Sequence, residues 1–300
     1  MSVMGHLPAS TAASGVPEQP KRRGLAGYLL LGPGGLWLVI FFVIPTITLA
    51  SSSLYDPSGS LDTGYAMTWH FQNYLDVFTR YHQYFLRSYG YALTSTVVCV
   101  VLGYPLAYAI AFKSGRWKNL MLVAVIAPFF TSFLVRTLAW KLILADHGWV
   151  VLSLQWLHVL GPDGHLLSTQ IAVITGITYN FLPFMVLPLY ASLERLDPRL
   201  LEAANDLYAS PFTAFRKVTL PLSMPGLVAG TLLTFIPAAG DFINAALLGT
   251  PQTTMIGLII QKLFLAFNLP AASALSVILM VSIVILVAIY VWRAGTEELV

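Results

Sequence analysis

The chain carries long apolar runs almost free of charge, and this feature limits the folds open to it. No charged residue occurs between Arg23 and Asp56. Within that interval, Tyr28–Ala50 would form about 35 Å of helix, enough to cross a bilayer. Comparable runs follow at Tyr91–Phe112, Asn119–Trp140, Thr169–Ser192, Met224–Leu248 and Ala271–Trp292. Charged residues are only 10% of the 300 residues, too few to cover a soluble globule. The sequence predicts an all-α, polytopic membrane protein with six transmembrane helices.

The first 24 residues differ from the rest of the chain. Met1–Gln19 is rich in Ser, Ala, Pro and Gly and has no apolar period, which predicts a disordered tail. The basic stretch Lys21–Arg23 then precedes the first apolar run. A cleaved signal peptide is the alternative, but this run is too long for the apolar core of one. We expect a cytoplasmic tail at 1–24 and a transmembrane domain at 25–300.

Basic residues predict the orientation of the spans. If the tail is cytoplasmic, eleven of the sixteen Lys and Arg residues fall in cytoplasmic segments: Lys21, Arg22, Arg23, Lys113, Arg116, Lys118, Arg195, Arg199, Arg216, Lys217 and Arg293. The other five lie outside or at the outer margin: Arg80, Arg87, Arg136, Lys141 and Lys262. Both termini are therefore predicted to be cytoplasmic.

The predicted outer segments are aromatic and nearly neutral. Ser51–Gly90 includes Trp69 and Phe71, and Lys141–Ser168 contains the amphipathic run ILADHGWVVLSLQWLHVL. An aromatic belt at the membrane interface and a docking surface for an external partner both fit this pattern. The histidines of the second segment have no recognisable metal-ligand spacing, so no metal site is expected.

A charged segment interrupts the apolar runs between the fourth and fifth spans and reads EAANDLYASPFTAFRKVTLPLSMPG. Asp197-Pro198 predicts the start of a helix, with Asp as the N-cap. Polar and apolar residues then fall on opposite helix faces, Arg199, Glu202 and Asp206 against Leu200, Ala203, Ala204 and Leu207. Ser210-Pro211 repeats the start signal for a second helix at Phe212–Val218. A solvated connecting loop is the alternative, but two capped helices favour a protein-binding platform outside the membrane.

This segment resembles the EAA loop of ABC-transporter permease subunits. The matching residues are Glu202, Ala203, Ala204, Asp206, Tyr208, Leu220 and Pro221. Other stretches resemble the first of the two permeases in spermidine/putrescine-type importers: Pro128–Trp140, Tyr179–Asp197, Phe235–Gly249, Met255–Gln261 and Asn268–Ser276. The resemblance covers roughly Tyr28–Arg293.

The resemblance implies a coupling loop at about 193–223 that inserts into a groove on a cytoplasmic ATPase subunit and passes its motion to the membrane helices. It implies a bacterial inner-membrane importer with a second homologous permease subunit, an ABC ATPase dimer and an external solute-binding protein. A polyamine is the favoured solute, and an opine or amino-acid-like compound is the alternative.

One residue departs from the family pattern. Where the family usually has Gly, this chain has Tyr208. Gly serves where the backbone needs a positive φ, and Tyr there would cost on the order of 1 kcal/mol. Either the chain accepts this cost or the turn bends differently.

Other functions fit the sequence less well. The chain contains no G-x-x-x-x-G-K-[ST], so we expect no cofactor, no catalytic residue and ATP bound by a separate subunit. An ion-coupled secondary transporter would need several ionisable residues at membrane depth, and the six spans offer only Asp241 and Arg136. AAGDFI distantly resembles the Gly-Asp motif of intramembrane aspartyl proteases, but a lone carboxylate cannot be both acid and base. The small net charge of +3 gives no indication of nucleic-acid binding.

Asp241 is the most informative candidate for a solute path. A carboxylate within a span is costly, so it should face a cavity or a partner. Alternatively it is wet at the outer membrane face or pairs with Arg136. The other candidates are Asn244, which would share the helix face of Asp241, and Tyr179, Asn180 and Trp140. Trp140 and Tyr179 could present π faces to an ammonium group.

Overall fold

The computed structural model describes residues 25–60 and 62–294, so the tail predicted at 1–24 lies outside the described residues. The chain falls into two parts, one ending at Ile47 and the other beginning at Thr48. In the first part, α1 (Leu25–Leu38) continues through a π-helical turn (Val39–Val43) into α2 (Ile44–Ser52). Leu31–Ser52 is apolar and long enough to cross a membrane, as the first predicted span requires.

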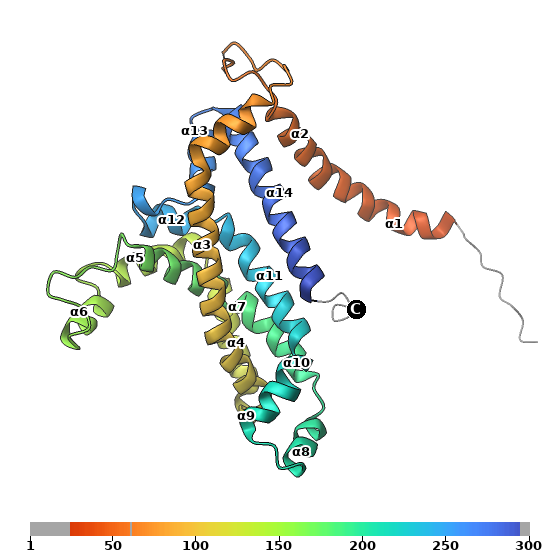
Figure 1. Cartoon of the computed structure of the whole chain (residues 1–300), viewed down its shortest axis with the longest axis vertical. Helices are drawn as coiled ribbons and strands as arrows, with labels where there is room; N and C mark the ends of the chain where they lie inside the picture. Colours follow the sequence, from red (N-terminus) through yellow and green to blue (C-terminus); the bar gives the residue numbers. More distant parts are fainter. Residues whose placement is uncertain (1–24, 61, 295–300) are drawn as a thin grey trace, which may run out of the picture. The chain divides into compact units, whose positions relative to one another are not determined.

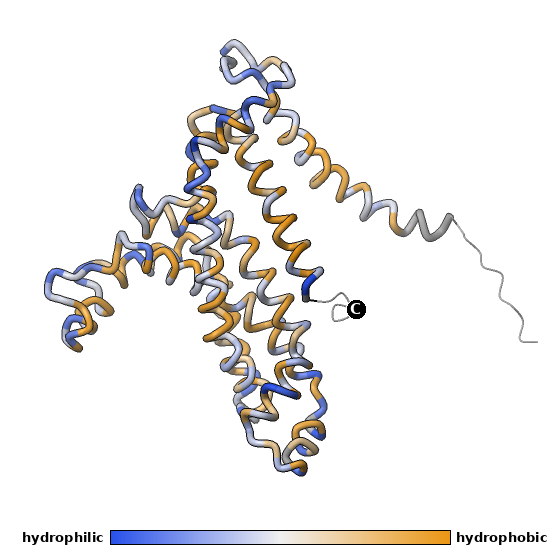
Figure 2. The backbone as a smooth tube through the Cα atoms, viewed as in Figure 1, coloured by the Kyte–Doolittle hydropathy of each residue, from blue (hydrophilic) through white to orange (hydrophobic). Residues whose placement is uncertain are grey.

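The second part is built around three long helices, α3 (Gln72–Tyr108), α7 (Gln170–Glu194) and α14 (Leu269–Ala294). Helix α11 (Met224–Ala239) packs against α3 and α7, and α14 packs against α3 (Figure 1). Figure 2 shows α14 apolar along almost its whole length, as expected of a helix that faces lipid. With α1–α2, four helices are long and apolar enough to cross a membrane, or six if two bent pairs count as one span each. The predicted fold class is confirmed.

Helix α3 begins earlier than predicted, because the outer segment at 72–90 is helical rather than a loop. The buried side chain of Asn73 donates to the carbonyl oxygens of Ser53 and Tyr55, both at 2.9 Å, and holds the start of the helix. Val77 and Phe85 then pack with Ile256 and neighbouring apolar residues of α13 (Ile256–Leu265) and α14. Aromatic residues at helical spacing thus form the buried face of this part of α3.

The third predicted span, Asn119–Trp140, is not one continuous helix but a bent pair. Helix α4 (Lys118–Ile126) runs into a 3₁₀ turn (Ala127–Phe130), and α5 (Phe133–Ile143) leaves at 97° to it. Pro128 lies in the turn, and the Ser132 hydroxyl accepts a hydrogen bond from Val135 N at 3.2 Å. The break therefore has a local cause, an N-cap inside an apolar run.

The fifth span also differs from the prediction, because α11 ends at Ala239 and α12 (Ile243–Leu248) is a separate short helix. Asp241 Oδ1 accepts a hydrogen bond from Asn244 N at 2.8 Å and caps the new helix. Gly257 packs tightly against this break: a Cβ on it would lie 2.2 Å from the carbonyl oxygen of Gly240. The break is thus fixed both by its own cap and by the chain that follows.

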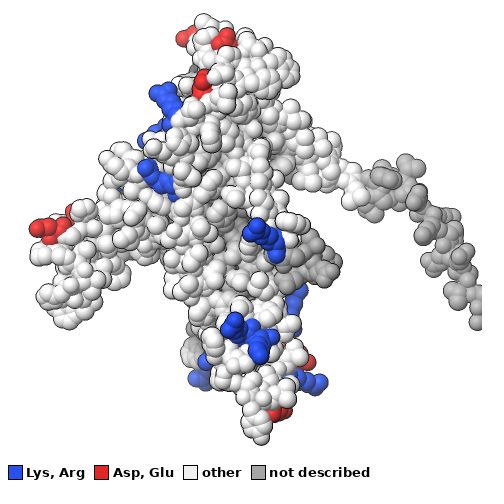
Figure 3. Space-filling view, in the orientation of Figure 1, with Lys and Arg blue, Asp and Glu red and all other residues white. Residues whose placement is uncertain are grey.

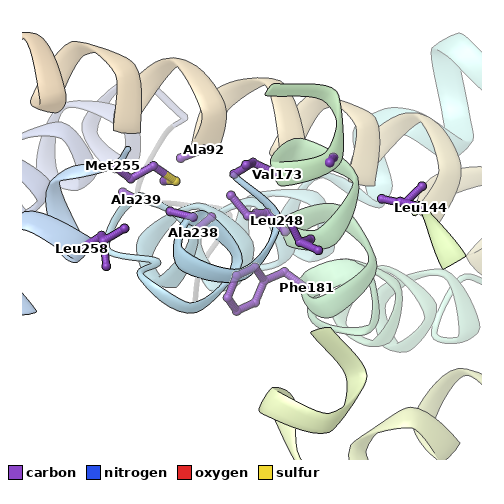
Figure 4. Packing of buried hydrophobic residues seen from close by; sticks show 12 residues of the cluster. Ala92, Leu144, Val173, Phe181, Ala238, Ala239, Leu248, Met255 and Leu258 are labelled. Carbon is purple, nitrogen blue, oxygen red and sulfur yellow. The ribbon is translucent and has the colours of Figure 1, made fainter. Parts of the chain in front are cut away.

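The main buried apolar cluster lies where α3, α7, α11 and α12 meet. It includes Ala92, Val173, Phe181, Ala238 and Leu248, several of which are shown in Figure 4. Small residues on α3 and α11 allow the helices to approach closely. The two broken helices are packed against this cluster, since Phe133 and Trp140 of α5 contact it.

Candidate functional site

The charged segment forms a pair of helices at the end of the bundle opposite α13 (Figure 1). Asp197 Oδ1 accepts a hydrogen bond from Arg199 N at 3.0 Å at the start of α8 (Pro198–Asp206). The Ser210 hydroxyl accepts one from Thr213 N at 3.3 Å at the start of α9 (Pro211–Ala214). Both helix starts are as predicted. The second helix is longer than predicted, because a π-helical turn (Phe215–Thr219) and α10 (Leu220–Leu222) continue it.

Tyr208 has a left-handed backbone, with φ of 56°. The chain therefore keeps the turn for which Gly is suited and accepts the cost of a side chain there. The side chain is 98% exposed. It gains no packing within the described residues that would offset this cost.

The two helices expose a mixed surface. Leu207 is 81% exposed and Phe212 is 71% exposed, and they flank Tyr208 in the sequence. Glu202, Ala203 and Asp206 are exposed as well, whereas Ala204 is buried. Large apolar side chains beside charged ones are typical of a protein-binding surface. Figure 3 shows charged side chains gathered around this end of the molecule, with most of the surface above them uncharged.

The second helix of the pair is anchored to the bundle. The Phe215 ring meets the Tyr104 ring of α3 edge to face at 5.4 Å. The Tyr104 hydroxyl forms a buried 2.6 Å hydrogen bond with Ser223, at the 66° bend before α11. Leu220 packs against a second buried apolar cluster, which contains Tyr104 and Leu189, whereas Pro221 is exposed. The second helix of the pair is therefore connected to α3 through Phe215 and to α11 through Ser223.

A buried polar cluster joins α5, α7 and α12. Asn244 Nδ2 donates to Asp241 Oδ2 at 2.9 Å, and Asn180 Nδ2 donates to Asn244 Oδ1 at 3.2 Å. Thr137 bonds with both amides, at 3.3 Å to Asn244 Oδ1 and 3.2 Å to Asn180 Nδ2. Asp241 is only 6% exposed. The structure thus brings together three of the predicted path residues, Asp241, Asn244 and Asn180. It adds Thr137, which was not predicted.

The remaining path candidates lie beside this cluster. Trp140 and Tyr179 are half-buried and meet edge to face at 5.3 Å between ring centres. The predicted alternative of an Asp241–Arg136 pair is not found: within 25–60 and 62–294 the ion pair present joins Lys118 and Glu194, at 2.6 Å. A separate cavity of about 440 Å³ lies between α13 and α14 and is lined by Gly240 and Phe242 rather than by Asp241.

Two residues that were not predicted, Thr137 and Ser132, could have been recognised from the sequence. Thr137 lies three residues before Trp140, on the α5 face that carries Phe133 and Trp140. Ser132 follows Pro128 and precedes an apolar run, which is the pattern of an N-cap. Tyr104 has no such local signal, because its contacts with Phe215 and Ser223 connect residues far apart in the sequence.

Comparisons with known proteins show which proteins this chain is similar to. Residues 99–294 match the family model described as binding-protein-dependent transport system inner membrane component. The spermidine/putrescine transport system permease protein PotB of Escherichia coli is 36% identical over 265 residues, covering 86% of this chain and 94% of that protein. The permease protein PotC of the same system and organism is 39% identical over 108 residues, covering 36% of this chain and 41% of that protein.

A solved structure shares the fold. The bacterial alginate ABC transporter in complex with an alginate pentasaccharide-bound periplasmic protein matches with a TM-score of 0.66 at 19% identity. The match covers 91% of this chain and 95% of that chain.

Proposed function

This chain belongs to the family of binding-protein-dependent transport system inner membrane components, and from this premise we propose its place in an importer. The chain is a multi-pass inner-membrane permease subunit of an ABC importer. It forms part of the translocation path for a small solute, and a separate subunit supplies the ATP hydrolysis.

The observation that carries this proposal is the exposed helix pair α8–α9. Its surface combines Glu202 and Asp206 with the exposed apolar side chains Leu207, Tyr208 and Phe212. Such a surface is costly in water unless a protein covers it. A groove on a cytoplasmic ATPase dimer is the partner that the resemblance implies, and Phe215 and Tyr104 connect the helix pair to the membrane helices.

The orientation follows from this role. In the proposed orientation the α8–α9 pair lies in the cytoplasm together with both termini, and the segments that contain α13 and α6 (Trp149–Trp156) lie outside. Eleven of the sixteen basic residues are then cytoplasmic, as the positive-inside rule requires. The outer segments meet the solute-binding protein, and a second, related permease completes the path.

The proposed solute is a polyamine. Similarity to PotB over most of both chains supports this choice. Asp241 supports it as well, because a carboxylate at membrane depth favours a cation there. An opine or amino-acid-like solute is the second candidate, because the binding protein contributes to specificity.

Measurements of solute uptake in cells test which solute the importer carries. Deleting the gene for this chain is expected to abolish import of labelled spermidine or putrescine at low external concentration, and a plasmid copy is expected to restore it. A matched assay uses labelled octopine and arginine. Loss of import for one of these with normal polyamine import would contradict the polyamine proposal while leaving the permease role intact.

A further inference from the structure

Arg136 is a buried cation for which the proposed transport role has no use. Its side chain is 8% exposed, and its Nε and Nη1 atoms are buried without a hydrogen-bond acceptor among the described residues. The guanidinium carbon lies 5.3 Å from the Phe129 ring centre and 5.6 Å from that of Phe133. The two rings stabilise the cation by cation–π contact. They offer no acceptor for its N–H groups.

Such a group requires a counter-charge. Removing a guanidinium from water costs several kcal/mol unless it is paired and hydrogen-bonded. Among the described residues, Asp241 accepts hydrogen bonds from Asn244 with both of its oxygens and forms no ion pair with Arg136. The remaining described acidic residues lie in the outer segments or at the end of the bundle that carries α8–α10. This chain therefore does not itself supply the partner in the described arrangement.

The surroundings of Arg136 indicate where the partner lies. The break before α5 exposes Thr131 and Ser132, and irregular backbone at membrane depth is tolerated only against protein or a water-filled cavity. Protein rather than lipid is expected to cover the break.

The chemistry of the proposed solute indicates which kind of group can be the counter-charge of Arg136. Trp140 lies one turn after Arg136 on α5 and contacts Tyr179, so Arg136 borders the proposed path. An unpaired guanidinium there would repel a polycation. A polyamine has no carboxylate with which to neutralise it, so the counter-charge has to be a protein group.

We propose that Arg136 pairs with a carboxylate of the companion permease subunit, which covers the break at Thr131–Ser132 and reaches Nη2, the guanidinium nitrogen that is not enclosed by this chain. The inference rests on the proposed function, which supplies that companion. In the assembled importer the pair closes the interface beside the path and leaves the path free of positive charge.

The test compares Arg136→Leu with Lys141→Leu, a control that removes an exposed cation from the same helix. Each variant is co-expressed with the companion permease and the ATPase, and the companion recovered per tagged chain is measured. Arg136→Leu is expected to lower recovery at least about tenfold, which corresponds to about 1.4 kcal/mol, and Lys141→Leu to leave it unchanged. Arg136→Lys is expected to lie between, because Lys keeps the charge but lacks the planar guanidinium that stacks on the two rings.

The chain expressed alone separates pairing from misfolding. Without the companion, Arg136→Leu is expected to match or exceed the wild type in thermal stability, because an unpaired charge has been removed. Equal companion recovery for Arg136→Leu and Lys141→Leu would overturn the inference. So would a lower stability of the lone Arg136→Leu chain, because contacts within this chain, such as those with Phe129 and Phe133, would then account for the buried cation. If the wild type recovers no companion permease, the proposed function fails, and the inference with it.

Discussion

Replacing Asp241 with Asn is expected to reduce polyamine uptake at least about tenfold while the importer still assembles. The Asn side chain can still accept from Asn244 N and so keep the cap of α12. The Asn side chain has no second acceptor oxygen, so the hydrogen bond that Asp241 Oδ2 accepts from Asn244 Nδ2 is lost. The negative charge is lost as well. A cation crossing lipid needs its charge offset along the way, so the charge is the larger loss for transport. Uptake and the amount of assembled complex are measured in the same membranes.

Two further variants help to interpret the result for Asp241→Asn. Asp241→Ala removes both acceptors and leaves buried donors on Asn244 unpaired, so it is expected to lower the amount of folded complex. Asp241→Glu keeps the charge and is expected to retain more uptake than Asn. Normal uptake by the Asn variant would remove Asp241 from the path. Loss of assembly in the Asn variant would assign Asp241 a structural role only.

Reversing the charge of Glu202 is expected to uncouple the permease from its ATPase. Glu202 is exposed on α8 and makes no ion pair within the described residues, so Glu202→Lys should not disturb the fold. At a docking surface the reversal replaces attraction by repulsion, and recovery of the ATPase with the tagged permease is expected to fall about tenfold. Solute-stimulated ATP hydrolysis is expected to fall with it.

A charge reversal in a segment that we propose to lie outside is the control. Asp163→Lys changes an exposed carboxylate in the segment between α6 and α7 and is expected to leave ATPase recovery unchanged. Unchanged recovery and unchanged uptake for Glu202→Lys would contradict the docking role of α8.

Local chemistry made much of this fold predictable. The caps at Asp197 and Ser210 depend on residues within three positions, and the spans depend on runs of apolar residues. The breaks at Ser132 and Asp241 were missed because each is a single polar cap inside an apolar run. At Tyr208 the sequence left two conformations open, and the structure has the left-handed one.

The candidate site was only partly predictable. Asp241, Asn180 and Asn244 stood out as polar residues in apolar surroundings, but their mutual hydrogen bonds depend on how α7 and α12 pack. Trp140 and Tyr179 were predicted to present π faces to an ammonium group, and nothing in the sequence indicated that the two rings contact each other edge to face. Pairwise contacts between distant segments carry no signal in a single sequence.

The central claim is that the helix pair α8–α9 is cytoplasmic and covered by a separate ATPase. The chain has a single cysteine, Cys99, which is buried, so Tyr208→Cys introduces a single exposed thiol. Asp163→Cys provides the matched position in a segment that we propose to lie outside. Both variants are treated with a membrane-impermeant maleimide, in intact cells with a permeable outer membrane and in inside-out vesicles stripped of or loaded with ATPase.

The thiol at position 208 is expected to react only in inside-out vesicles and to be protected when the ATPase is bound, whereas the thiol at 163 is expected to react only in the cells. Labelling of position 208 from outside, or labelling in vesicles that bound ATPase does not slow, would contradict the account.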